Sequence, residues 1–251
     1  RAGWLGIALA TLVFGLRELD FCARRDALHV AAAAAAFRSG PARAVDKPKA
    51  FKFGRQAEQV ADLWLPRDGQ TPKGVIALLH GGFWLSQYGK DLMNDLARDA
   101  VQRGYAALNL EYRRVGSPTW KDANTTLEDV AAGLDLLASG KLPLQSGLQT
   151  AVIGHSAGGH LALWSQLRPG EFTPAAAVVS TGGVLDLCYA ESEELGGGAV
   201  NRFLNYQDTA SVRRQVSPID MLPPCRVNSL QGADASRGVA PTARIGLIHG
   251  G

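Results

Sequence analysis

The sequence predicts an α/β protein with a mostly parallel β-sheet, doubly wound with helices on both faces. The short run 75–79 has the length and continuous hydrophobicity of a strand that is buried on both faces, and 106–110 is interpreted as the next strand. Segments with apolar residues at helical spacing alternate with these runs, as in proteins built from βαβ units. The length of 251 residues suits a single α/β domain.

The strands follow one another in a simple order along the chain. Residues 51–54 and 60–65 are expected to form an antiparallel edge in front of the parallel strands. The expected parallel strands are 75–79, 106–110, 151–153, 175–179 and 245–248.

Helices are expected between these strands. An apolar stripe over 92–101 is ended by Gly104. Thr125 and Glu128 have the spacing of a capping box, which predicts that a helix begins there. A further helix is expected over 158–168, because Pro169 follows it.

Composition excludes several classes of protein. Hydrophobic residues are 46% and charged residues 20%, which excludes a disordered or collagen-like chain. The 26 Lys and Arg residues exceed the 23 Asp and Glu residues by a net charge of +3, too little to indicate a nucleic-acid partner. Three widely spaced cysteines form neither a metal-binding pattern nor a disulfide framework, which slightly favours a reducing compartment.

The N-terminal 46 residues are predicted to be a separate apolar and alanine-rich helical segment with a linker, followed by the main domain at 47–251. The apolar run 4–16 would rise about 20 Å as a helix, less than the ~30 Å hydrocarbon core of a membrane. It is interpreted either as a buried or interfacial helix or signal-peptide core, or as the end of a transmembrane helix. Membrane association through 4–16 and the location in the cell therefore stay open.

The motif GHSAG at residues 154–158 indicates a catalytic serine, because it matches G-x-S-x-G. It follows an apolar strand and opens an amphipathic helix, which is the setting of a nucleophile elbow. Such a turn would project the Ser156 hydroxyl from the carboxyl end of the sheet. The N-terminus of the following helix would favour negative charge that develops there.

The motif HGGFW at residues 80–84 directly follows the strand 75–79. Two glycines let the backbone approach a ligand closely and direct N–H groups toward it. Amides near Gly82 and Phe83, together with the amide of Ala157, would bind the oxyanion of a tetrahedral intermediate. The alternative without a catalytic role is a Gly-Gly turn beside a core aromatic residue.

Together the two motifs resemble the α/β-hydrolase superfamily, in the esterase and formamidase branch that has an HGG-x-W oxyanion motif. Carboxylesterase-like hydrolases and kynurenine formamidases belong to this branch. Further stretches that look like the family are YGKDLMNDLA, LEYRRVG, TLEDVAAGLDLL, GVLDL and SPIDMLP. The resemblance covers roughly residues 50–223 and the final RIGLIHGG, and it is specific for the branch but not for a substrate.

The resemblance implies a role for each matching residue. Ser156 takes the role of the nucleophile. The oxyanion role falls to the backbones of Gly81, Gly82, Phe83 and Ala157. Trp84 and Tyr88 are similar to pocket-wall residues, with core packing as the alternative for Trp84. No metal or organic cofactor is implied.

The histidines near the motifs have a different expected role. In the family, the positions of His80 and His155 are structural hydrogen-bonding positions rather than the catalytic base. His160 follows Ser156 by four residues on the same helix and is expected to point into packing.

The acid and the base of the catalytic triad depart from the family pattern. In the family the acid follows the strand that RIGLIHGG resembles, and the histidine follows one strand later. His249 matches the histidine of that strand end, so we expect the acid and base, with a last strand and helix, to lie beyond residue 251. The chain is therefore expected to be a fragment or a mispredicted coding sequence, and residues 1–251 alone to be nearly inactive. The segment 226–243 is interpreted as an insertion or a mis-spliced exon.

Two acidic residues between Ser156 and His249, Asp186 in GVLDL and Asp220 in SPID, lie in motifs that are interpreted as structural. Residues 184–210 are expected to form a cap over the pocket.

The sequence thus predicts a serine hydrolase that cleaves a small carboxylic ester or N-formyl amide through an acyl-enzyme. Two alternatives stay open. One is a non-catalytic binding protein with the same fold, which would have no need of the serine. The other is a membrane-anchored esterase, which depends on residues 4–16 alone.

Overall fold

The computed structural model of the protein describes residues 47–67, 70–170, 172, 174–207, 209–222 and 244–248, the last of these as backbone only. Three sequence predictions lie outside these residues: the segment 1–46, the stretch 226–243 and His249. In the described part no helix is long and apolar enough to cross a membrane.

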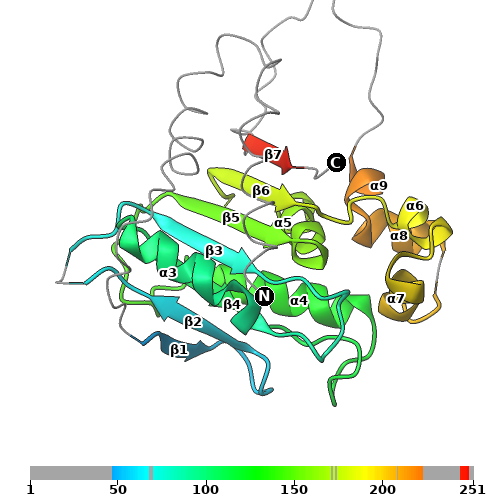
Figure 1. Ribbon diagram of the computed structural model, residues 1–251, viewed down its shortest axis with the longest axis horizontal. Helices are drawn as coiled ribbons and strands as arrows, with labels where there is room; N and C mark the ends of the chain where they lie inside the picture. Colours follow the sequence, from blue (N-terminus) through cyan, green and yellow to red (C-terminus); the bar gives the residue numbers. More distant parts are fainter. Residues whose placement is uncertain are drawn as a thin grey trace, which may run out of the picture.

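A mixed β-sheet forms the centre of the described part, with the strand order β1-β2-β4-β3-β5-β6-β7 (Figure 1). β1 and β2 are antiparallel to each other, β2 is antiparallel to β4, and the other neighbours are parallel. This confirms the predicted parallel sheet with an antiparallel edge. The strands are β1 (Lys49–Lys52), β2 (Val60–Trp64), β3 (Val75–Leu79), β4 (Ala106–Leu110), β5 (Thr150–His155), β6 (Ala177–Thr181) and β7 (Arg244–Ile248).

Two strands begin two residues away from their predicted starts, and β5 extends beyond the predicted 151–153 at both ends. β1 covers 49–52 instead of 51–54, because Lys49 and Ala50 already pair with β2 while their side chains remain exposed at the edge. β6 covers 177–181 instead of 175–179. The amide of Ala175 donates instead to the side chain of Gln166, at 2.8 Å, so the ladder begins only after it.

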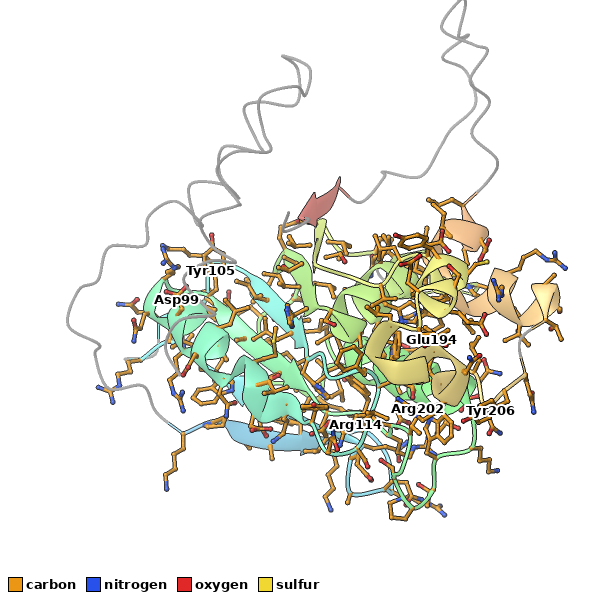
Figure 2. The ribbon with its side chains drawn as sticks, turned by 45° about the vertical axis from the view of Figure 1, so that its right-hand side comes forward. Asp99, Tyr105, Arg114, Glu194, Arg202 and Tyr206 are labelled. Atoms are coloured by element: carbon orange, nitrogen blue, oxygen red, sulfur yellow. The ribbon has the colours of Figure 1, made fainter. Side chains whose placement is uncertain are left out.

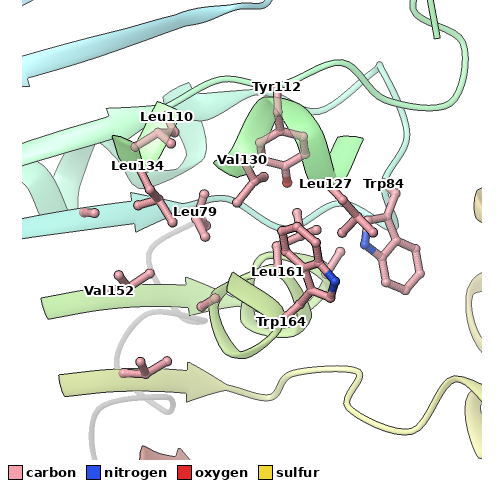
Figure 3. Close-up of a cluster of buried hydrophobic side chains, with 14 of the residues drawn as sticks. Leu79, Trp84, Leu110, Tyr112, Leu127, Val130, Leu134, Val152, Leu161 and Trp164 are labelled. Atoms are coloured by element: carbon pink, nitrogen blue, oxygen red, sulfur yellow. The ribbon is translucent and has the colours of Figure 1, made fainter. Parts of the chain in front are cut away.

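Helices pack on both faces of the sheet, as predicted. On one face, α3 (Asn94–Gln102) follows a short 3₁₀ turn, η3 (Lys90–Met93), and buries a cluster with Leu78 and Ala107. On the other face, α4 (Ala123–Asp135) and α5 (Ala157–Leu167) contribute to the larger core. Figure 3 shows this larger core between the sheet and these two helices.

The start of α4 corrects one sequence prediction. The N-cap is Asp122, whose side-chain carboxylate accepts a hydrogen bond from the amide of Thr125 at 3.2 Å. Thr125 is therefore inside the first turn rather than at its cap, and the predicted capping box is wrong. An aspartate at an N-cap satisfies an amide that the helix leaves free, so it replaces the threonine in that role.

The described residues after β6 form four short helices beyond the carboxyl ends of β5 and β6 (Figure 1). These are α6 (Leu187–Ser192), α7 (Leu195–Phe203), α8 (Ala210–Val216) and α9 (Pro218–Met221). α6 and α7 are the main part of the segment 184–210. Its role as a cap over a pocket stays a prediction.

Candidate active site

Ser156 occupies a sharp turn between β5 and α5. Its backbone dihedral angles are φ 53° and ψ −121°, which L-residues adopt at a cost of roughly 1–3 kcal/mol. Two hydrogen bonds hold the turn: the amide of Ser156 donates to Thr181 O at 2.9 Å, and Ser156 O accepts from the amide of His160 at 3.1 Å. The serine is half-buried and stands at the N-terminus of an 11-residue helix.

Close backbone packing explains the small residues of this turn. A Cβ atom on Gly158 would collide with the carbonyl oxygens of Leu79 and His80 at the end of β3. The elbow and the carboxyl end of β3 therefore touch at backbone level. The positive end of the α5 dipole adds a favourable field for an anion at this point.

The loop after β3 lies directly against the elbow. A Cβ atom on Gly81 would stand 3.1 Å from the Cβ of Ser156. The next three residues all have positive φ: 111° for Gly82, 54° for Phe83 and 55° for Trp84. The structure thus brings the predicted oxyanion loop to Ser156 and to Ala157, the first residue of α5.

His80 anchors the base of this loop. Its ring is fully buried, its Nδ1–H donates to Gly81 O at 2.7 Å, and it stacks on Tyr112 with 4.3 Å between ring centroids. Nε2 lies 2.9 Å from an Oε1 of Glu111. Arg114 also contacts that carboxylate. These contacts agree with the structural role expected for His80.

Trp84 lies in the core, where its side chain is 1% exposed (Figure 3). Its indole stacks on Phe203 of α7 with 4.5 Å between ring centroids, and its Nε1–H donates to Nδ1 of His160 at 3.3 Å. This is the packing alternative for Trp84. Tyr88 is half-buried, and its side chain lies against Gly82 of the loop at 80–84.

His160 is fully buried, and its Nε2–H donates to Val216 O at 2.7 Å. The structure thus confirms that His160 points into the packed interior. His155 is not buried like His160: its side chain is exposed, and it lies beside Gly81.

Burial sets the charge state of the two buried histidines. It lowers the pKa of His160 to about 4 and that of His80 to about 3, both from the ordinary 6.5. The His160 ring is therefore neutral at neutral pH.

Acid is expected to destabilise the fold through His160. Between pH 4 and 6.5 the unfolded chain binds a proton at this histidine that the folded chain does not. Stability should then fall as the pH drops through this window, by about 1 kcal/mol per pH unit. Urea unfolding at about pH 7 and about pH 5 measures this. The fall should be smaller in His160→Asn, and an equal fall would contradict it.

Within the described residues, the structure assigns neither an acid nor a base to Ser156. Asp186 caps α6, accepting from the amide of Tyr189 at 2.9 Å, and Asp220 lies exposed in the first turn of α9. The cap agrees with the structural interpretation of Asp186, and that of Asp220 stays a prediction. The same part of the chain holds no group of three His, Cys, Asp or Glu side chains placed to bind a metal ion.

The first residues of α7 also contact the loop at 80–84, and the sequence analysis did not predict this contact. Gly196 has φ 63°, and a Cβ atom on it would collide with the ring of Phe83. Arg202 closes this turn by donating to Gly197 O at 2.7 Å and to Gly196 O at 3.0 Å. Figure 2 shows Glu194 and Arg202 at this helix.

Known proteins with similar sequences and structures point to one family. The sequence model of the BD-FAE family matches residues 61–219, more than half of the chain. The rice (Oryza sativa subsp. japonica) protein named "Probable isoprenylcysteine alpha-carbonyl methylesterase ICME" is 31% identical over 121 residues. These make up 46% of this chain and 27% of that protein.

Solved esterases share the fold. Esterase B from Lactobacillus rhamnosis, inhibited by a tributyrin phosphonate, is 21% identical with a TM-score of 0.56, covering 76% of this chain and 64% of that one. Propionate-bound Est2 from Thermogutta terrifontis is 19% identical with a TM-score of 0.53, covering 70% and 67%. The predicted α/β-hydrolase fold and the resemblance to its esterases are confirmed. The chain spans less than two thirds of the rice protein and of esterase B.

Proposed function

Since this chain belongs to the BD-FAE family, we propose that it is a serine hydrolase that cleaves small carboxylic esters or N-formyl amides through an acyl-enzyme. The observation that carries the proposal is the strained backbone of Ser156 between β5 and α5, with the HGG loop against it. A serine in an ordinary turn would not be held in such a strained conformation, and strain of this kind is concentrated at functional sites. The esterases among the relatives and solved structures support the same reaction class.

The proposed reaction runs in two steps. Ser156 Oγ attacks the carbonyl carbon while its proton passes to a base, and the carbonyl oxygen becomes an oxyanion. Amides of the loop at 81–83 and of Ala157 donate to that oxyanion, and the α5 dipole favours the charge. The intermediate collapses, the alcohol or amine leaves with a proton, and the serine is acylated. Water then attacks the acyl carbon and releases the acid.

Trapping with methanol tests the acyl-enzyme. Acetyl esters with different leaving groups all form the same acetyl-Ser156, so the ratio of methyl acetate to acetate should not depend on the leaving group. The full chain, meaning the full-length protein with the acid and base that are expected beyond residue 251, is incubated with p-nitrophenyl acetate and, separately, phenyl acetate in dilute methanol, and the products are quantified. A ratio that changes with the leaving group would mean that water attacks the substrate directly, which would contradict the proposal.

The contact between α7 and the oxyanion loop gives a second test. Gly196→Ala should displace the ring of Phe83 and lower kcat about tenfold, because the amide of Phe83 would move from its place. Gly197→Ala is the matched control: φ is 61°, close to the 63° of Gly196, but a Cβ there meets nothing within 4 Å. Steady-state kinetics of both variants measure the difference. Equal kcat values in the two variants would exclude an effect of this contact on catalysis.

A further inference from the structure

Two non-glycine residues of the oxyanion loop have a backbone that they do not favour by themselves. Phe83 and Trp84 follow Gly82 with φ values of 54° and 55°. Left-handed backbone at consecutive bulky residues persists only where the surroundings enforce it. The contacts of their side chains therefore decide whether the loop keeps this shape.

Trp84 supplies the strongest of these contacts. Its indole is 1% exposed and stacks on Phe203, and its one hydrogen-bond donor meets Nδ1 of His160 at 3.3 Å. His160 also packs edge-on against the indole, at 5.3 Å between centroids and 88° between planes. A buried indole N–H without an acceptor would be costly.

The acceptor at Nδ1 depends on a bond at the opposite side of the ring. Nε2 of His160 lies 2.7 Å from Val216 O, which can only accept, so Nε2 carries the proton. In a neutral imidazole Nδ1 then keeps its lone pair and faces the Trp84 indole. The end of α8 thus selects the tautomer that accepts from the loop.

The same histidine is joined to the nucleophile through the backbone. His160 follows Ser156 by one helical turn, and its amide donates to Ser156 O at 3.1 Å. One residue therefore bonds the elbow through its main chain and the oxyanion loop through its side chain.

We propose that His160 is a positioning residue for the oxyanion loop, acting through the indole of Trp84 to keep the left-handed turn at Phe83 in place beside Ser156. The inference rests on the proposed serine-hydrolase function. His160 does not touch substrate, and its effect reaches the reaction only through the position of the loop amides.

Two substitutions separate the two hydrogen bonds of the ring. In His160→Asn the side-chain oxygen falls near the place of Nδ1, so Trp84 keeps an acceptor and the Val216 bond is lost. In His160→Gln the longer amide reaches the place of Nε2, so the Val216 bond is kept and Trp84 loses its acceptor. Both replace the ring by a smaller amide, which makes them matched controls for lost packing.

In the full chain, kcat for p-nitrophenyl acetate should be about tenfold or more higher in His160→Asn than in His160→Gln, with KM changed far less. Trp84→Phe replaces the indole by a smaller aromatic ring that has no N–H donor, and it should lower kcat as His160→Gln does. The double variant Trp84→Phe with His160→Gln should be no slower than either single variant, because both remove one bond. Equal kcat values in Asn and Gln variants that remain folded, or additive losses in the double variant, would overturn the proposal.

Exchange of the indole proton gives a readout that needs no activity. The sequence has five tryptophans, and the Trp84 indole signal in an ¹⁵N-tryptophan spectrum is the one that Trp84→Phe removes. Its exchange with solvent should be slow in the wild type and in His160→Asn, and markedly faster in His160→Gln. Slow exchange in His160→Gln would contradict the proposed bond.

These readouts also separate the two proposals. A full chain without esterase activity would refute the proposed function, and the positioning role with it. An active enzyme whose kcat does not change when the indole bond is lost would refute the positioning role alone.

Discussion

Replacing Ser156 with alanine is expected to lower kcat for p-nitrophenyl acetate by about 10⁴-fold or more, because the acyl-enzyme can no longer form. A residual rate over water should remain, since the oxyanion amides still bind the reacting carbonyl. Alanine keeps the Cβ atom that the turn already accommodates at φ 53°. The free energy of unfolding should therefore change by less than about 1 kcal/mol.

The matched control for this substitution is Ser180→Ala. Ser180 is a buried serine near the end of β6, the strand next to β5, and its hydroxyl has no hydrogen-bond partner among the residues that the structure describes. Its removal should leave kcat within about twofold of the wild type. If Ser156→Ala retained the wild-type kcat while Ser180→Ala lost it, the assignment of Ser156 as the nucleophile would be wrong.

Gly82→Ala should lower kcat by about 10²-fold or more, the cost of losing an oxyanion donor. At φ 111° an alanine is strained, and its Cβ would collide with the ring of Tyr88. The loop must therefore change course beside Ser156, where its amides are proposed to bind the oxyanion. Steady-state kinetics and thermal unfolding of the purified variant measure the two consequences separately.

Gly140→Ala is the control for backbone strain, because Gly140 has φ 70° and a Cβ there meets nothing within 4 Å. It should lose stability by roughly 1 kcal/mol without losing activity. A Gly82→Ala variant with unchanged kcat and a stability loss like that of Gly140→Ala would remove the loop from the mechanism.

β3 was predictable because it is a continuous apolar run, and β4 because Asn109 is the one polar residue in its run. Both strands lie at the predicted residues. The strands at 49–52 and 177–181 were misplaced for a physical reason. An edge strand exposes residues such as Lys49, and Ser180 and Thr181 belong to β6 through backbone pairing rather than through hydrophobicity.

The turn at Ser156 and the loop at 80–84 were predictable for a different reason. Both motifs are short, and their chemistry depends on backbone turns that few residue types permit. The contacts that hold the loop were not predictable, because they join residues far apart in sequence. Trp84 and His160 are 76 positions apart, and nothing in either motif indicates that one ring accepts a hydrogen bond from the other.

Labelling with a fluorophosphonate probe tests the central claim most directly. The probe phosphonylates an activated serine, and mass spectrometry of the digested full chain identifies the residue that carries the adduct. The account predicts one adduct, on Ser156 in the peptide that contains GHSAG, and no labelling of Ser156→Ala. An adduct on another serine, or equal labelling of the wild type and Ser156→Ala, would contradict the claim that Ser156 is the nucleophile.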